Sequence, residues 1–363
     1  MRTLKCSIGK HNEYYRYIAK KWLFLVSLVI ILLAAAIVSI SVGSSGIPIS
    51  EVLRALFGFS NEATSQTIVW NVRMPRVATA VSVGIALAMA GCVMQSVLRN
   101  PLASASTLGV SQGASFGASI AIVYFQAGAQ ISNASSASIS VTNPYTVATW
   151  AFLGGISTTL VILMLSRVSG VSPAVMILAG VALSSMFTGA TTLIQYFSDD
   201  DMVASIVYWT FGNLGRAGWK EISLIFILSV LAFFYFFLNR WNYNAMESGA
   251  NTAKSLGVNV DRLILVSMSI ATLISATAIA FVGTISFIGL IAPHIVRRFV
   301  GSDYRFLIPC SALMGGVIML LADIASRMIK APAILPIGAI TSFLGGPLFL
   351  YLIIKQRKKR WVD

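Results

Sequence analysis

The feature that most restricts the fold is a pair of apolar, small-residue-rich segments on either side of Arg99-Asn100-Pro101. Each segment approaches or exceeds the roughly 20 residues that a helix needs to cross a bilayer. A proline disfavours helical backbone at the residue before it, so the Asn-Pro pair predicts a helix end between the segments. We therefore expect a transmembrane hairpin over residues 73–117, with its turn at one face of the membrane.

Apolar residues dominate the whole chain. Of its 363 residues, 57% are hydrophobic and 10% are charged, whereas a soluble domain carries about 25% charged residues. We predict an all-α membrane protein with one transmembrane domain over residues 1–363 and about ten spans. The first apolar run is too long for a cleaved signal peptide. The expected spans are 22–43, 74–98, 108–126, 145–166, 174–197, 221–239, 263–282, 285–300, 306–328 and 335–354.

The basic residues predict the orientation. With both termini on one side, the segments on that side hold 19 of the 26 Lys and Arg residues. The positive-inside rule then places both termini and the Asn100 turn in the cytoplasm, and Arg73, Arg76 and Arg327 outside. The net charge of +14 does not indicate nucleic acid, because these residues lie in short loops and at the termini.

Catalytic and metal-binding patterns are missing from the sequence. It contains two histidines and three scattered cysteines, and it has no HExxH, GxSxG or GxxxxGK[ST] motif. We therefore expect no catalytic residue, no metal site and no bound cofactor on this chain. Asp323 and Arg327 are four residues apart, which is the spacing of an ion pair on one helix.

Small and hydroxyl residues suggest how the spans pack. Glycine, alanine, cysteine and serine recur at intervals of four over 84–96 and 109–121, a pattern that favours close helix packing in lipid. One face of the span 174–197 is instead polar, which suits either helix–helix hydrogen bonds or a wetted path. The residues on that face are Gly180, Ser184, Thr188, Thr192 and Gln195.

The segment 241–262 is too polar to cross the membrane. The sequence predicts a short amphipathic helix over Ala245–Leu256, ended by Gly257 as a C-cap. We interpret it as either an ordinary connector or a docking helix for a cytoplasmic partner.

These residues resemble one known family. Several motifs occur in the family's order, from about residue 15 to the end of the chain. They include Arg73-Met-Pro-Arg76, Arg99-Asn-Pro-Leu-Ala103, Trp209-Thr-Phe-Gly212, Ala253-Lys-Ser-Leu-Gly257 and Leu335-Pro-Ile-Gly338. The chain is similar to the permease subunits of type II ABC importers for iron-siderophores, haem and vitamin B12.

The resemblance implies ten spans per subunit and a second permease copy, identical or related. It also implies two cytoplasmic ATPase subunits that bind ATP-Mg, an external substrate-binding protein, and a multi-pass location in a prokaryotic cytoplasmic membrane. By the same resemblance, 241–262 is the coupling loop and the span 174–197 lines the path. The implied site residues are Asn100, Pro101, Leu102, Val171 and Ser172 as the cytoplasmic gate; Ala245, Met246, Ala253, Leu256 and Gly257 for ATPase coupling; and Arg73, Arg76 and Arg327 for docking the binding protein.

The expected activity is therefore import of a metal chelate, most directly an iron-siderophore, with haem or a corrinoid as the alternative. The chain departs from the family at Ile334, where a glutamate often precedes the Leu-Pro-[IV]-Gly motif. A secondary transporter is the rival from another class. The sequence has no series of intramembrane carboxylates of the kind that proton-coupled carriers use.

Overall fold

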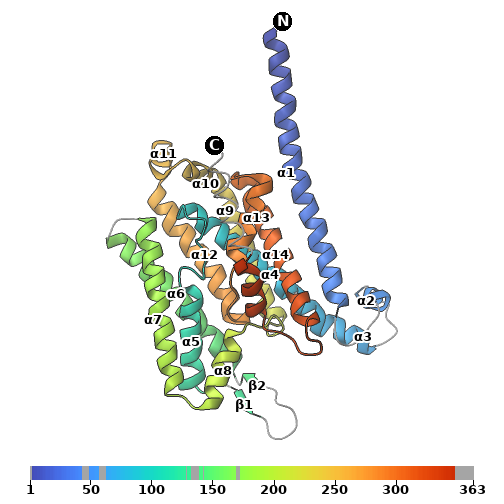
Figure 1. Cartoon of the computed structure of the whole chain (residues 1–363), viewed down its shortest axis with the longest axis vertical. Helices are drawn as coiled ribbons and strands as arrows, with labels where there is room; N and C mark the ends of the chain where they lie inside the picture. Colours follow the sequence, from blue (N-terminus) through green and yellow to red (C-terminus); the bar gives the residue numbers. More distant parts are fainter. Residues whose placement is uncertain are drawn as a thin grey trace.

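The computed structural model describes residues 2–42, 49–56, 63–127, 129–131, 139–141, 143–168 and 172–347. Figure 1 shows them as one elongated bundle of helices. The labelled elements are α1 (Arg2–Ser41), α2 (Ile49–Leu56), α3 (Ala63–Ile68), the π-helical turn η1 (Val69–Arg73), α4 (Met74–Val97), α5 (Val110–Tyr124), β1 (Ala129–Ile131), β2 (Ile139–Val141), α6 (Pro144–Val168), α7 (Pro173–Tyr196), α8 (Asp200–Thr210), α9 (Trp219–Leu238), α10 (Arg240–Glu247), α11 (Ala250–Ser255), α12 (Val260–Val282), α13 (Ile288–Val300) and α14 (Tyr304–Met328).

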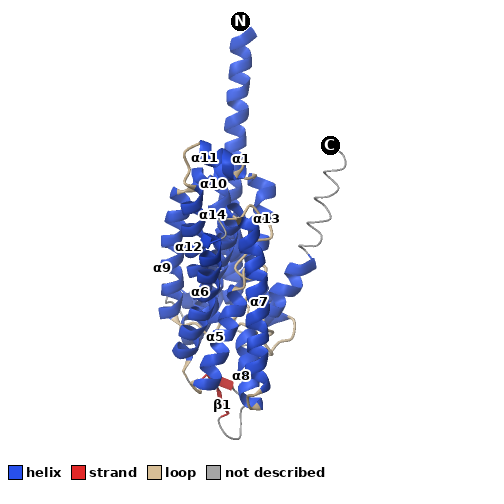
Figure 2. Ribbon diagram, turned by 90° about the vertical axis from the view of Figure 1, so that its left-hand side faces the viewer, coloured by secondary structure: helices blue, strands red, loops and turns tan. Residues whose placement is uncertain are grey.

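The helices run along the long axis, and the bundle has two distinct ends (Figure 2). We call the end with α10 and α11 the α10 end, and the end with α8 and the β1–β2 hairpin the α8 end. Helix α1 extends beyond the bundle at the α10 end (Figure 1). Residues 337–347 form a further helix, whose continuation lies outside the described residues.

Seven helical segments of the described chain are long and apolar enough to span a membrane: Tyr15–Ser41, Thr64–Val97, Pro144–Ser166, Pro173–Tyr196, Trp219–Leu238, Val260–Val282 and Tyr304–Met328. The other three predicted spans correspond to α5, α13 and the helix at 337–347. Their described parts are shorter than the roughly 20 residues of a full span. The count of ten therefore stays a prediction.

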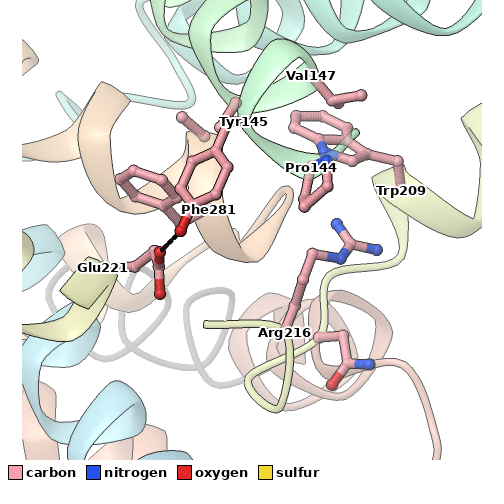
Figure 3. A pocket seen from close by; sticks show the side chains of 10 residues that line it. Pro144, Tyr145, Val147, Trp209, Arg216, Glu221 and Phe281 are labelled. Atoms are coloured by element: carbon pink, nitrogen blue, oxygen red, sulfur yellow. Dashed lines mark hydrogen bonds between the residues drawn. The ribbon is translucent and has the colours of Figure 1, made fainter. Parts of the chain in front are cut away.

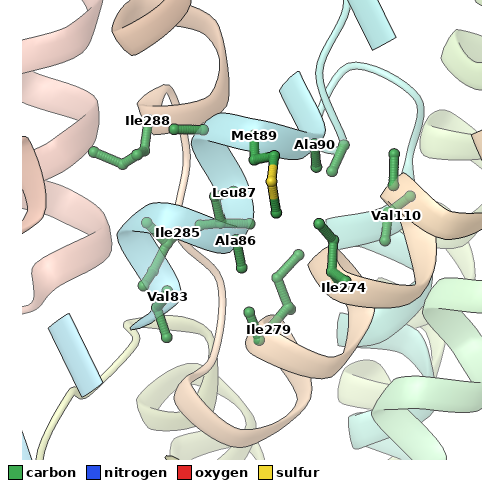
Figure 4. Packing of buried hydrophobic residues seen from close by; sticks show 14 of the residues in the cluster. Val83, Ala86, Leu87, Met89, Ala90, Val110, Ile274, Ile279, Ile285 and Ile288 are labelled. Atoms are coloured by element: carbon green, nitrogen blue, oxygen red, sulfur yellow. The ribbon is translucent and has the colours of Figure 1, made fainter. Parts of the chain in front are cut away.

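Helix α4 is the centre of the packing. In its most apolar stretch 83% of residues are buried, against 22% in the corresponding stretch of α1. Side chains of α4 such as Val83 and Leu87 meet apolar side chains of α12 and α13, including Ile279 and Ile288 (Figure 4). The inner position of α4 explains its near-uniform apolar surface, because a helix surrounded by other helices has no polar face.

Glycines bring the inner backbones into contact. A methyl group at Gly84 would lie 2.4 Å from the carbonyl oxygen of Gly315 in α14, and one at Gly117 would lie 2.0 Å from that of Trp150 in α6. The close packing predicted from the four-residue spacing is confirmed at these positions. Gly109 differs, because it precedes α5 with φ of 84°.

Three local features differ from the sequence-based expectations. The loop expected over 127–144 contains an antiparallel strand pair with Gln130 opposite Ser140. The span expected to begin at 285 begins as α13 at Ile288, because Phe287 has a left-handed backbone with φ of 67°. The single helix expected over 245–256 is split into α10 and α11, because Gly249 has φ of 117°.

Candidate functional site

The predicted gate residues 100–102 lie in a tight turn after α4. Arg99 has φ of 47°, and the side-chain oxygen of Asn100 accepts a hydrogen bond from the backbone N–H of Leu102 at 2.8 Å. Pro101 and Leu102 are exposed, with Leu102 at 43%. The turn thus presents an apolar tip at the surface of this chain. Ser172 is the N-cap of α7, and Val171 lies outside the described residues.

The predicted coupling residues lie beside this turn. A methyl group at Gly249, between α10 and α11, would be 4.0 Å from both terminal nitrogens of Arg99. Met246 and Ala253 are buried, whereas Leu256 is 69% exposed. The C-cap of α11 is Leu256, and Gly257, which was predicted as the C-cap, is the next residue, with φ of 85°. Because the helix is broken at Gly249, Met246 of α10 and Ala253 of α11 are both buried while Leu256 remains exposed.

A polar network joins α10 to the last turn of α13 and to the first residue of α14. The Asn244 side-chain oxygen accepts a hydrogen bond from the backbone N–H of Tyr304 at 2.8 Å. Arg297 forms an ion pair with Glu247 at 3.2 Å and donates to the Tyr304 hydroxyl at 3.0 Å. Helix α10 is thereby tied to both α13 and α14.

Asp303, the N-cap of α14, extends this network to α1. Its carboxylate forms ion pairs with Arg305 at 2.8 Å and with Lys21 of α1 at 3.4 Å. Burial alone would raise the pKa of Asp303, but the hydrogen bonds and charges of Arg305 and Lys21 together hold it at about 2. The carboxylate is therefore ionised at physiological pH. No local sequence pattern indicates Asp303 or Lys21, because their pairing joins segments 282 residues apart.

The predicted path residues of α7 differ in their surroundings. Gly180 is buried against Leu108, Ser184 and Gln195 are partly buried, and Thr188 and Thr192 are exposed. The hydroxyls of Ser184, Thr188 and Thr192 each donate to the carbonyl four residues earlier, at 2.8–3.0 Å. Because their hydrogens bind the helix backbone, these hydroxyls present mainly acceptor lone pairs to their surroundings.

At the α8 end, two of the three predicted docking arginines pair with one buried carboxylate. Asp323 forms ion pairs at 2.8 Å with Arg76 and with Arg327. The pair with Arg327 was predicted from spacing and is confirmed. The pair with Arg76 of α4 was missed, because these residues are 247 positions apart.

Arg73 and Arg327 also bind the end of α1. Arg73 donates to the carbonyl oxygen of Ile40 at 2.7 Å, and Arg327 donates to those of Val42 and Ser39. The last carbonyls of a helix lack partners within it, and α1 has no basic residue in its last turn. The two guanidiniums supply the missing donors. All three arginines thus have contacts within this chain.

Comparison with solved structures defines the class of protein. A structure of a metal-chelate type ABC transporter in an inward-facing conformation superposes with a TM-score of 0.77 at 30% identity, covering 91% of this chain and 98% of that one. The helical bundle described above is therefore the fold of an ABC importer permease.

Sequence comparisons then give the family. The model of the FecCD transport family matches residues 31–355, and the chain belongs to that family. It is 48% identical to an ABC transporter permease protein of Methanocaldococcus jannaschii, over 96% of this chain and 99% of that protein. It is 36% identical to the iron(3+)-hydroxamate import system permease protein of Bacillus subtilis, over 90% of this chain and 82% of the relative.

Proposed function

We propose that this chain forms the translocation path of an importer for an iron chelate, and that the chelate is an iron-siderophore. The observation that carries the proposal is the FecCD family match over residues 31–355, together with a relative named for iron-hydroxamate import. The chain would work with a second permease copy, either identical or related. It would be a multi-pass protein of a prokaryotic cytoplasmic membrane, surrounded by lipid.

ATP–Mg would bind to two separate ATPase subunits at the α10 end, and this chain would hydrolyse nothing itself. The exposed Leu256 and Gly257 would contact an ATPase, with the buried Met246 and Ala253 anchoring the contact. Ala245 completes this proposed coupling segment. An apolar side chain that is 69% exposed on a short helical element suits a protein-docking role.

Motion of α10 and α11 would reach the gate by two routes. The direct one is Arg99, whose guanidinium lies next to Gly249. The indirect one is the network from Asn244 and Glu247 to Tyr304 and Arg297, which would move α13 and α14 with α10. Closure at Asn100–Leu102 would be completed by the partner copy, with Val171 and Ser172 as the second part of the gate.

The polar face of α7 would line the path. Acceptor lone pairs along Ser184, Thr188 and Thr192 suit a bulky, hydrated solute better than a bare cation, because no fixed charge stands on this face. Gly180 and Gln195 belong to the same proposed set.

An external binding protein would dock at the α8 end. Arg73, Arg76 and Arg327 outnumber Asp323 by two charges, so their cluster would attract acidic side chains. The contacts that each arginine makes within the chain would hold this charged platform rigid. The docking role itself rests on the family resemblance.

The coupling proposal is tested at Leu256. We expect Leu256→Asp to lower co-purification of the ATPase subunits with the tagged permease by about tenfold or more, because a charge would replace a desolvated apolar contact. Leu256→Met keeps an apolar side chain and is the matched control, expected to retain the ATPase. Size-exclusion chromatography checks that both variants stay folded. Normal ATPase recovery with Leu256→Asp would refute the assigned docking site.

A further inference from the structure

The segment between α8 and α9 is held rigidly at the α8 end. The backbone N–H of Asn213 donates to Val282 of α12 at 2.7 Å, and that of Gly338 donates to the carbonyl of Phe211 at 3.0 Å. The Thr284 hydroxyl donates to Thr210. These bonds fix residues 210–213 against two other parts of the bundle. Arg216 lies three residues after Asn213 and donates its backbone N–H to the Asn213 carbonyl at 3.3 Å, so it is carried on a preorganised support.

Two cavities open on either side of this segment, and Asn213 and Arg216 line both. The first has a volume of about 430 Å³ and includes Tyr145, Trp209 and Glu221 in its lining. The second, about 300 Å³, includes Arg76 and Ile334. Both volumes fall in the range of small-molecule sites. Figure 3 shows the Arg216 guanidinium pointing into the first cavity, toward Trp209 and Pro144.

The guanidinium of Arg216 has spare binding capacity. Its Nη1 atom is buried and has no hydrogen-bond partner among the described residues. Burial lowers the pKa of Arg216 from its ordinary value, because the charge loses water. An arginine nonetheless stays protonated in proteins, so a buried hydrogen-bond donor that carries a positive charge faces the cavities.

Among the residues that the structure describes, Glu221 is the one carboxylate in the lining of the first cavity, and it already has hydrogen-bond donors. Glu221 accepts a hydrogen bond from the Tyr145 hydroxyl at 2.7 Å and one from the backbone N–H of Gly218 at 2.8 Å. Figure 3 shows this pair across the cavity from Arg216. In the second cavity, Arg76 adds another positive charge, although it is bound to Asp323. The first cavity thus has a cation, Arg216, and an anion, Glu221, on opposite sides, and aromatic side chains lie between them.

We propose that Arg216 binds a carboxylate group of the chelate in the cavities at the α8 end. A guanidinium forms paired hydrogen bonds with a carboxylate, and such charge-assisted bonds are the strong ones. The aromatic side chains would contact the organic body of the same ligand. The inference rests on the proposed import function and makes Arg216 the residue that favours chelates with free carboxylates over those without.

The experiment measures equilibrium binding of two iron complexes to the full permease–ATPase complex in lipid nanodiscs. The ferric citrate complex carries free carboxylates, and a ferric trihydroxamate carries none. We expect Arg216→Gln to weaken binding of the citrate complex by about tenfold or more, and to change trihydroxamate binding by less than about twofold. Arg216→Lys should restore part of the loss. Arg54→Gln is the matched control, because Arg54 lies at the same end with an exposed side chain.

Three results would overturn the proposal. The first is wild-type-like citrate binding by Arg216→Gln, and the second is an equal loss for both complexes, which would indicate structural damage. The third is no citrate binding by the wild type at millimolar concentration. If the binding protein docks less well to Arg216→Gln while citrate binding is unchanged, Arg216 binds a carboxylate of the binding protein and not one of the chelate. ATPase co-purification from the same samples separates these failures from failure of the import function.

Discussion

Asp323 shows how one buried charge organises the α8 end. It is completely buried. One of its carboxylate oxygens pairs with Arg76 of α4, and the other pairs with Arg327 of its own helix. A carboxylate in this position is stable only because cations accompany it. The same arginine on α14 binds the last carbonyls of α1, so the cluster joins three helices.

Replacing this carboxylate should destabilise the protein strongly. We expect Asp323→Asn to lower the free energy of unfolding by about 3 kcal/mol, because it leaves two partly desolvated guanidiniums without their counter-charge. Thermal unfolding in detergent micelles measures the effect. Asp200→Asn removes an exposed carboxylate at the same end and should change stability by less than about 0.5 kcal/mol. Equal melting temperatures for the two variants would contradict this role of Asp323.

Residue-level prediction from sequence succeeds for contacts within one element. The spacing of four between Asp323 and Arg327 was sufficient to predict their pair. Neither Arg76 with Asp323 nor Lys21 with Asp303 has such a local signal, since each pair depends on which helices become neighbours. The burial of the Arg216 Nη1 atom, which has no hydrogen-bond partner in the described part of the chain, is likewise a property of the fold.

At the scale of elements, glycine positions determine how closely the inner helices approach. A methyl group at Gly91 of α4 would lie 1.8 Å from the carbonyl oxygen of Gly289 in α13. No rotamer change can relieve such a clash, because the obstructing atom is backbone. Gly189 on α7 has no atom within 4 Å of the same position.

The two glycines provide a matched pair of substitutions. Gly91→Ala should lower the free energy of unfolding by about 1–3 kcal/mol or more, since it forces α4 and α13 apart. Gly189→Ala should leave stability unchanged or raise it slightly, because alanine favours the helix. Melting temperatures and the yield of monodisperse protein measure both. A melting temperature for Gly91→Ala no lower than that of Gly189→Ala would refute the close contact.

Helix positions follow from sequence because span length is set by the membrane. The span expected over 74–98 is α4 at Met74–Val97, and the one over 174–197 is α7 at Pro173–Tyr196. The elements that could not be predicted depend on single backbone conformations. Phe287 has a positive φ and shifts the start of α13 to Ile288, and Gly249 has a positive φ and separates α10 from α11. Neither residue interrupts the hydrophobic pattern.

At the scale of the whole molecule, the two ends have different chemistry. The α10 end carries the exposed Leu256 and the turn at Asn100–Leu102 that we propose as the gate. The α8 end carries the arginine cluster and the cavities beside Arg216. The proposed importer uses these ends for an ATPase and for substrate delivery, respectively, with α4 as the rigid connection between them.

Uptake by the reconstituted complex tests the import function most directly. The permease, its ATPase subunits and its binding protein are placed in proteoliposomes with ATP at the α10 end, and uptake of a radioactive ferric siderophore is measured. We predict that uptake requires ATP hydrolysis and persists when ionophores collapse all ion gradients. Ion-gradient-driven uptake without ATP, abolished by the ionophores, would contradict ATP-driven import and identify a secondary transporter.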